Sequence, residues 1–230
     1  MRLVIFYSVI FSILFSSCRK DEHATTDPNA KLSLSKDIIL FDTIFTTIGS
    51  VIKTVKIINK NNDAVNISEI LLAGGNSSPF SININGQNAS SRANLKLNGQ
   101  DSLNIFVKVS INPNTKNTPF LVQDSIVFHS NGNRQSIQLI AYGQNAVFIN
   151  NGVINTNTTW NNNLPYIING AVTILNNAKL DISPGAKIYF HKDAIMNIEG
   201  KLSVNGTTAE PVQFSSDRTE DIFANEPGQW

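Results

Sequence analysis

Pairs of apolar residues separated by one residue recur through the last third of this chain. The pairs are Val172/Ile174, Leu180/Ile182, Ile188/Phe190, Met196/Ile198, Leu202/Val204 and Val212/Phe214. Every third pair returns after 22 to 24 residues, and Lys179–Ile182 (KLDI) is matched by Lys201–Val204 (KLSV). A period this short, built from strand-like units, predicts a solenoid whose turns bury their apolar side chains against one another.

Three short strands per turn resemble the right-handed parallel β-helix, which we expect over residues 149–230. Gly170, Gly185, Gly200 and Gly206 fit the sharp bends between its strands, because glycine adopts backbone conformations closed to other residues. A second antiparallel sandwich is the open alternative. We favour the β-helix because a sandwich gives no reason for the pairs to recur in threes.

Only about two turns are legible before Trp230, after a polar segment, Asn150–Asn163, that we expect to be a junction. Repeat proteins generally need three or more units and a cap to bury their core. We therefore expect the product to be a truncated or split form of a longer protein.

Residues 31–148 show a different pattern, in which short alternating runs are separated by turn residues such as Asn85-Gly86 and Asn131-Gly132. In the run Leu103–Ile111, every odd position is apolar, which buries one face of a strand. Similar runs are Ile38–Phe41, Val51–Ile58, Phe80–Ile84, Asn94–Leu97, Ser125–Phe128 and Ser136–Tyr142. About seven short strands predict an immunoglobulin-like antiparallel β-sandwich.

Four segments of this domain, Val55–Asn61, Pro79–Ile82, Leu103–Val109 and Ser125–Gly132, resemble the Hydin-type immunoglobulin-like module. That module commonly lies near the anchors of bacterial surface proteins. The resemblance implies a spacer or interaction role without catalytic residues in this domain.

The first 17 residues have the layout of a secretory signal: Arg2, an apolar run, and then Ser16-Ser17 before Cys18. Small residues directly before a cysteine resemble the lipobox of bacterial lipoproteins, although Phe15 stands where that motif usually has Leu. The resemblance implies a lipid on Cys18 and attachment to the membrane through this anchor. A signal cut elsewhere and an uncleaved anchor are the alternatives.

Residues 18–30 are expected to be the acylated cysteine and a flexible tether. Within it, Arg19–Glu22 resembles the surface-export signal of Bacteroidota lipoproteins, which implies an outer-membrane protein facing the cell exterior. The order of domains, a sandwich followed by a β-helix, is similar to that of Bacteroidota surface proteins. Two segments of the expected β-helix, Asn157–Trp160 and Leu180–Gly185, carry this resemblance.

Composition narrows the classes of function. The 18 Lys and Arg against 17 Asp and Glu lack the basic surplus typical of nucleic-acid binding. One cysteine excludes an internal disulfide and a cysteine-based zinc site. Only 15% of residues are charged while 31 are Asn, which favours turns over helices.

No candidate catalytic or metal site stands out. The three histidines, His23, His129 and His191, share no metal-ligand spacing, and His191 is expected to be a turn residue. Four acidic residues could line one face of the solenoid, as in polysaccharide lyases, but no pair is singled out. These are Asp181, Asp193, Glu199 and Glu210. We expect no metal and no cofactor.

Three Asp-Ser/Thr-apolar segments match the acceptor of Bacteroidota O-glycosylation, which makes Thr43, Ser102 and Ser125 candidate acceptors. The same pattern also occurs where a turn leads into a strand, so both interpretations are open.

The sequence as a whole favours a lipid-anchored surface protein with a non-catalytic role in display, adhesion or binding of a glycan or protein. The main rival is the N-terminal part of a β-helix polysaccharide lyase or glycoside hydrolase. A fragment without autonomous function is the third alternative.

Overall fold

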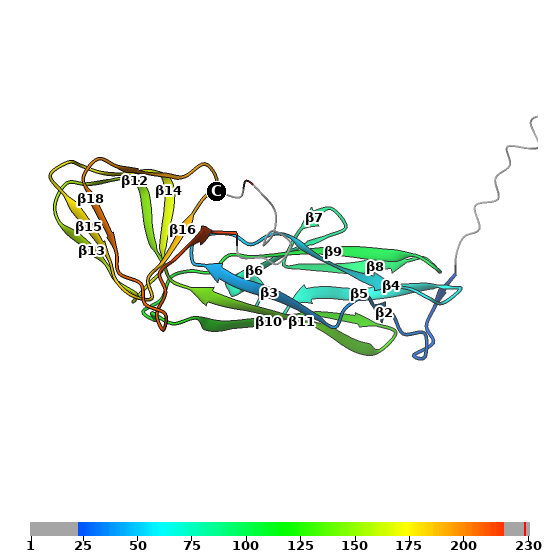
Figure 1. The fold of residues 1–230 in the computed structure, drawn as a ribbon. Helices are drawn as coiled ribbons and strands as arrows, with labels where there is room; N and C mark the ends of the chain where they lie inside the picture. Colours follow the sequence, from blue (N-terminus) through cyan, green and yellow to red (C-terminus); the bar gives the residue numbers. More distant parts are fainter. Residues whose placement is uncertain (1–22, 219–227, 229–230) are drawn as a thin grey trace, which may run out of the picture.

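The computed structural model describes residues 23–218 and 228. Apart from one 3₁₀ turn, η1 (Gly75–Ser77), every regular element in these residues is a β-strand. Figure 1 shows an elongated molecule with a two-sheet sandwich at one end and a solenoid at the other. The prediction of an all-β chain is confirmed. Within the same residues, no helix has the length and apolar character needed to cross a membrane.

The sandwich consists of two sheets that share one apolar core. The first has the order β1-β5-β10-β11-β3 with β8 also on β5, and the second has the order β2-β4-β9-β6-β7. Their bounds are β1 (Ala24–Thr25), β5 (Ala64–Leu72), β10 (Phe120–Ser130), β11 (Asn133–Gln144), β3 (Ile38–Phe45), β8 (Ser91–Leu97), β2 (Ser33–Leu34), β4 (Lys53–Ile58), β9 (Ser102–Val109), β6 (Phe80–Ile84) and β7 (Gln87–Asn88). Side chains from both sheets, Phe41 and Phe128 with Ile57 and Ile105 among them, are fully buried between them.

The predicted alternation of buried and outward-facing side chains is confirmed in β9. Its odd-numbered residues from Leu103 to Val109 are buried, while its even-numbered residues face outward. Two features differ from the prediction. The central strand β5 was not predicted, since its sequence AVNISEILL carries apolar residues on both faces. Two pairings, β1 with β5 and β3 with β11, are parallel, although the rest of the sandwich is antiparallel as predicted.

Both predicted Asn-Gly turns close two-residue hairpins. Asn85 and Gly86 have φ of 49° and 87°, and Asn131 and Gly132 have φ of 47° and 76°. Positive φ at both central positions defines the turn whose twist matches that of the flanking strands, and these residues adopt it at low cost.

The solenoid is made of strands that all pair in parallel and complete about three turns. One sheet has the order β12-β14-β16-β19 with β17 also on β14, and the other has the order β13-β15-β18. The bounds are β12 (Val147–Ile154), β13 (Thr158–Trp160), β14 (Tyr166–Ile174), β15 (Lys179–Ile182), β16 (Lys187–Phe190), β17 (Ile195–Ile198), β18 (Lys201–Val204) and β19 (Gln213–Ser216). The segment expected to be a polar junction instead contributes to β12 and β13, which form the first turn.

The register between turns agrees with the repeat at two positions and differs at the third. Ile174 pairs with Ile198, and Leu180 pairs with Leu202, as predicted. Phe190, however, pairs with Ser216, while Phe214 pairs with Ile188. A shift of two residues leaves the same side chains facing inward, so alternation in the sequence could not detect it.

Gly170 and Gly200 show why the path of the solenoid needs glycine. Gly170, with φ of 78°, lies where β14 bends between its contacts with β16 and β17. At Gly200 a Cβ atom would lie 2.1 Å from the carbonyl oxygen of Leu175, so no larger residue fits.

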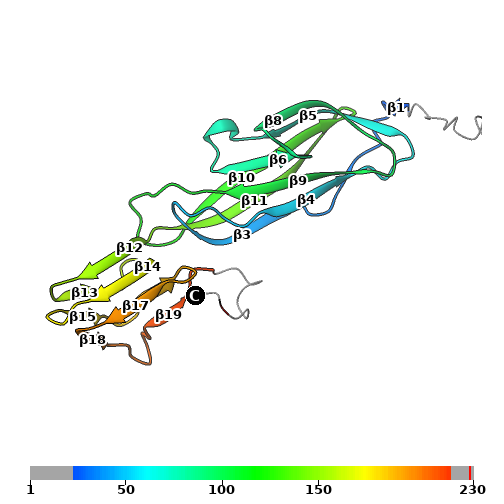
Figure 2. The same cartoon turned by 90° about the horizontal axis from the view of Figure 1, so that it is seen from above.

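Part of the expected tether packs on the sandwich. Ala24 and Thr25 form β1, which pairs with β5 through Ala64 and Val65, and Ala30 is 8% exposed. Figure 2 shows β1 at the end of the sandwich farthest from the solenoid. Cys18 and the other expected anchor residues lie outside the described part of the chain.

Asn59 is a fully buried polar residue that ties three segments of the sandwich together. Its side-chain nitrogen donates to the carbonyl oxygens of Asp63, Leu97 and Asn98 at 2.9 to 3.1 Å. Its side-chain oxygen accepts a hydrogen bond from the backbone nitrogen of Asn61 at 3.0 Å.

We predict that Asn59→Asp destabilises the protein by about 3 kcal/mol, because a carboxylate replaces the donor that faces three carbonyl oxygens. The shift of the urea unfolding midpoint measures the effect. Asn112→Asp is the matched control, since Asn112 is exposed and should change stability by less than about 0.5 kcal/mol. Equal shifts for the two variants would contradict this role of Asn59.

Candidate functional site

The sandwich and the solenoid meet at an aromatic contact. The ring of Phe45, at the end of β3, lies 5.0 Å from the ring of Tyr189 in β16, measured between centroids. Phe45 is only 5% exposed. Burial raises the pKa of the Tyr189 hydroxyl above its ordinary value of 10.0, because the charged phenolate is poorly solvated there.

The connection between the two parts is short and held by hydrogen bonds. Only Asn145 and Ala146 separate β11 from β12. The buried Asn145 side chain donates to the carbonyl oxygens of Asn114 and Lys116 at 2.8 and 2.7 Å. The strand that leaves the sandwich is therefore fixed where the solenoid begins.

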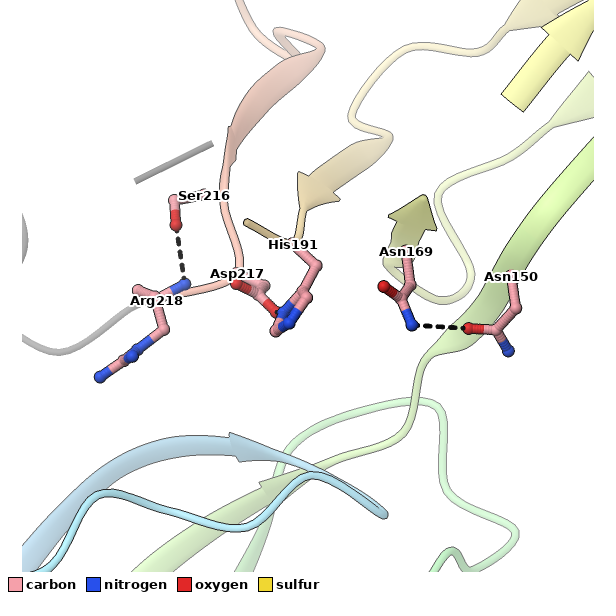
Figure 3. A network of polar contacts seen from close by, with 6 residues as sticks. All are labelled: Asn150, Asn169, His191, Ser216, Asp217 and Arg218. Carbon is pink, nitrogen blue, oxygen red and sulfur yellow. Dashed lines mark hydrogen bonds and ion pairs between the residues drawn. The ribbon is translucent and has the colours of Figure 1, made fainter. Parts of the chain in front are cut away.

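A column of polar residues runs across the turns of the solenoid at its corner beside the sandwich. In the parallel register Asn150 pairs with Asn169, and the pairs Ile168–Phe190 and Phe190–Ser216 place His191 and Asp217 next in line. Figure 3 shows this column, in which the side-chain nitrogen of Asn169 donates to the side-chain oxygen of Asn150 at 3.2 Å. Neighbouring parallel strands lie about 4.8 Å apart, so equivalent residues of successive turns come into contact.

The last two members of the column form a histidine–carboxylate pair. His191 Nδ1 lies 2.7 Å from Asp217 Oδ2, and the contact is an ion pair when the ring is protonated. The Asp217 side chain is 3% exposed, whereas that of His191 is 49% exposed. The other carboxylate oxygen, Oδ1, is buried and has no hydrogen-bond partner within residues 23–218.

This pair borders a cleft of about 430 Å³ between the solenoid and the sandwich. The solenoid side of the cleft is formed by His191, Asp217 and Arg218, and the sandwich side includes Lys108 and residues 48–52 of the connection between β3 and β4. Lys108 lies over Gly49, where an added Cβ atom would be 3.0 Å from the lysine Nζ. Within residues 23–218, three basic side chains and one carboxylate therefore line a single cleft.

The chemistry of this cleft is that of polar and anionic ligands. With Nδ1 held by Asp217, the second ring nitrogen of His191, Nε2, remains to face a ligand. Lys108 supplies a donor that carries permanent positive charge. Among residues 23–218 and 228, no group of three or more His, Cys, Asp or Glu side chains is arranged to hold a metal ion.

The candidate glycosylation sites do not lie together. Ser102 begins β9 and Ser125 lies within β10. Thr43 lies in β3 and lines the cleft between the solenoid and the sandwich. The backbone nitrogens of Ser102 and Ser125 each donate at 2.7 Å to the aspartate that precedes them. Glycosylation of these hydroxyls stays a prediction. The other two histidines, His23 and His129, lie in the N-terminal segment and in β10, away from the column.

The sequence did not predict that His191, Asp217 and Lys108 line the same cleft. His191 opens a turn, as predicted, since the backbone nitrogen of Ala194 donates to its carbonyl oxygen at 2.9 Å. Asp217 lies outside the predicted repeats because the last predicted repeat is two residues out of register. An alignment of Asn150, Asn169, His191 and Asp217 would have exposed the column. Lys108 carries no such signal, since it comes from the other domain.

Residues 152–230 match a family described as a pectate-lyase-like β-helix domain. This match agrees with the predicted parallel β-helix and with the observed solenoid. A search of curated protein sequences finds no match to this chain.

Solved structures with partial similarity include a family 123 glycoside hydrolase from Clostridium perfringens, at 11% identity and a TM-score of 0.37. The alignment covers 54% of this chain and 26% of the hydrolase, so this chain spans about a quarter of its length. The YadV chaperone has 12% identity and a TM-score of 0.32, covering 48% of this chain and 50% of its own. A PapD-like domain of human CEP192 has 11% identity and a TM-score of 0.33, covering 57% and 94%.

We predict that the stability of the protein falls above about pH 10 and that Tyr189→Phe weakens this dependence. Above the unfolded pKa, the unfolded chain has lost a proton that the folded protein keeps on Tyr189, so rising pH favours unfolding. Urea unfolding midpoints at about pH 9 and about pH 11 measure the difference.

Tyr142→Phe is the control, because it removes a hydroxyl from a ring that is 44% exposed. The control should keep the alkaline loss of stability. The same loss in Tyr189→Phe as in the unaltered protein would rule out a buried phenol at the junction.

Proposed function

We propose that this protein is an outer-membrane lipoprotein, fixed through Cys18 and facing the cell exterior, that displays its β-helix as a non-catalytic binding module for a glycan or a protein. The observation that supports the proposal is that the start of the described chain and the solenoid lie at opposite ends of the sandwich (Figures 1 and 2).

The N-terminal segment is held at the far end of the sandwich by the β10–β11 hairpin. The side-chain nitrogens of Asn131 and Asn133 donate to the carbonyl oxygens of Asp27 and Pro28 at 3.1 and 2.7 Å. A chain anchored before residue 23 would thus pull on this end, and the solenoid would point away from the membrane.

The sandwich then serves as a spacer. β11 has 12 residues, which at about 3.4 Å per residue span about 40 Å. It leads into β12 through two residues, and the Phe45–Tyr189 contact adds a second link. A ligand site at the junction would therefore stand about 40 Å from the point where the anchor segment joins.

An enzyme acting on polysaccharide is the second candidate, favoured by the match of residues 152–230 to pectate-lyase-like domains and by the His191–Asp217 pair. Release of reducing ends from acidic and neutral polysaccharides tests it. Activity that His191→Ala abolishes would replace the binding role with catalysis, and no release above the buffer blank supports the binding role.

For the anchor, we predict that Cys18→Ser abolishes incorporation of labelled palmitate and moves the protein from the membrane to the soluble fraction, because two or three acyl chains hold a lipoprotein far more firmly than one. Ser16→Ala, which keeps a small residue before the cysteine, should label normally. Protease treatment of intact cells then reports which face of the membrane the protein occupies.

Unchanged labelling of Cys18→Ser would refute the lipid anchor. Protection of the membrane-bound protein from added protease, with degradation only after lysis, would refute exposure at the cell exterior.

A further inference from the structure

We propose that the cleft between the sandwich and the β-helix binds an acidic saccharide, with Lys108 and His191 contacting its carboxylate. The inference rests on the binding role proposed above, whose ligand class it names, but it does not depend on the lipid anchor. It starts from side chains that two separate domains bring to one cleft.

The balance of charge in the cleft favours an anion. Among the described residues that line it, Lys108, His191 and Arg218 are basic and Asp217 is the one carboxylate. That carboxylate already contacts His191 at 2.7 Å. Within residues 23–218, no carboxylate lies within 4.0 Å of the Lys108 nitrogen, so its charge is available to a ligand.

Asp217 supplies an independent sign of a ligand. Its side chain is 3% exposed and borders the cleft, yet the Oδ1 atom has no hydrogen-bond partner within residues 23–218. Buried carboxylate oxygens are normally satisfied, because removing them from water without a donor is costly. A hydroxyl group beside the carboxylate of a sugar acid is a donor of the required kind.

The remaining wall of the cleft suits the ring of a sugar. Ile48, Val51 and Ile52 come from the β3–β4 connection, and Ile52 is 64% exposed. The C–H face of a pyranose packs well against apolar side chains, while its hydroxyl and acid groups point toward polar ones. A volume of about 430 Å³ lies within the range of small-ligand sites.

The position of the Lys108 ammonium depends on Gly49. A Cβ atom at residue 49 would lie 2.6 Å from Lys108 Cε and 3.0 Å from Nζ, so Gly49→Ala would push the ammonium away and leave its charge in place. Gly49→Ala therefore tests whether the position of the charge matters, whereas Lys108→Gln tests whether the charge itself matters.

The test is titration of the full-length protein, purified in detergent, with D-glucuronate as the probe, followed by calorimetry and by ligand-observed NMR. We expect binding that Lys108→Gln weakens about tenfold or more, since the variant loses a charge-assisted contact. Gly49→Ala should also weaken binding. Lys56→Gln, which removes the same charge from an exposed position on β4, should not.

The roles of His191 and Asp217 are tested by a measurement that a purely structural role would leave unchanged. Asp217→Asn keeps the shape of the side chain but removes its charge, so we expect it to weaken glucuronate binding and to change the ¹⁵N shifts of the His191 ring nitrogens. Near-UV circular dichroism of each variant verifies that the junction is folded.

Each outcome decides between alternatives. No binding of glucuronate, or binding that Lys108→Gln leaves unchanged, overturns the proposal. If inorganic sulfate binds with the same affinity as glucuronate, the cleft is a general anion site and the saccharide part of the proposal is wrong. If methyl glucoside binds with the same affinity, the acidic group is not recognised and that part of the proposal is wrong. Binding of a different glycan at another surface would leave the proposed binding role in place while refuting this site.

Discussion

The register of parallel pairing between successive turns determines both the core of the solenoid and the position of its polar column. It stacks inward-facing apolar residues such as Leu180 and Leu202 into a continuous core. The same register continues past the strand ends and brings Asn150, Asn169, His191 and Asp217 into one column. Core and candidate site therefore arise from one set of backbone hydrogen bonds, since residues 22 or 26 positions apart meet only through the stacking of turns.

The second determinant is the junction. A solenoid turn and a sandwich each bury their own core, but Phe45 belongs to neither core and is covered where the two parts meet. This contact, together with the hydrogen bonds of Asn145, brings Lys108 of one domain near His191 of the other. The cleft is a product of the fixed arrangement of both domains.

Much of the fold could be predicted from the sequence, because period-two alternation and Asn-Gly pairs act locally. The strand Ser102–Val109, the turn at Asn131-Gly132 and the pairing of Lys179–Ile182 with Lys201–Val204 all follow from such signals. The strand Ala64–Leu72 escaped prediction because both of its faces carry apolar residues. The candidate site could not be predicted, since a two-residue shift hid Asp217 and Lys108 reaches the cleft only through tertiary structure.

The Phe45–Tyr189 contact and the two-residue connection should hold the sandwich and the solenoid in a fixed arrangement, which a distance measurement between spin labels tests. Labels at Lys56→Cys and Lys201→Cys, in the Cys18→Ser background, report on the two domains from exposed positions. A fixed arrangement should give one narrow distance distribution, and Phe45→Ala should broaden it. A broad distribution in the protein with Phe45 intact would contradict it.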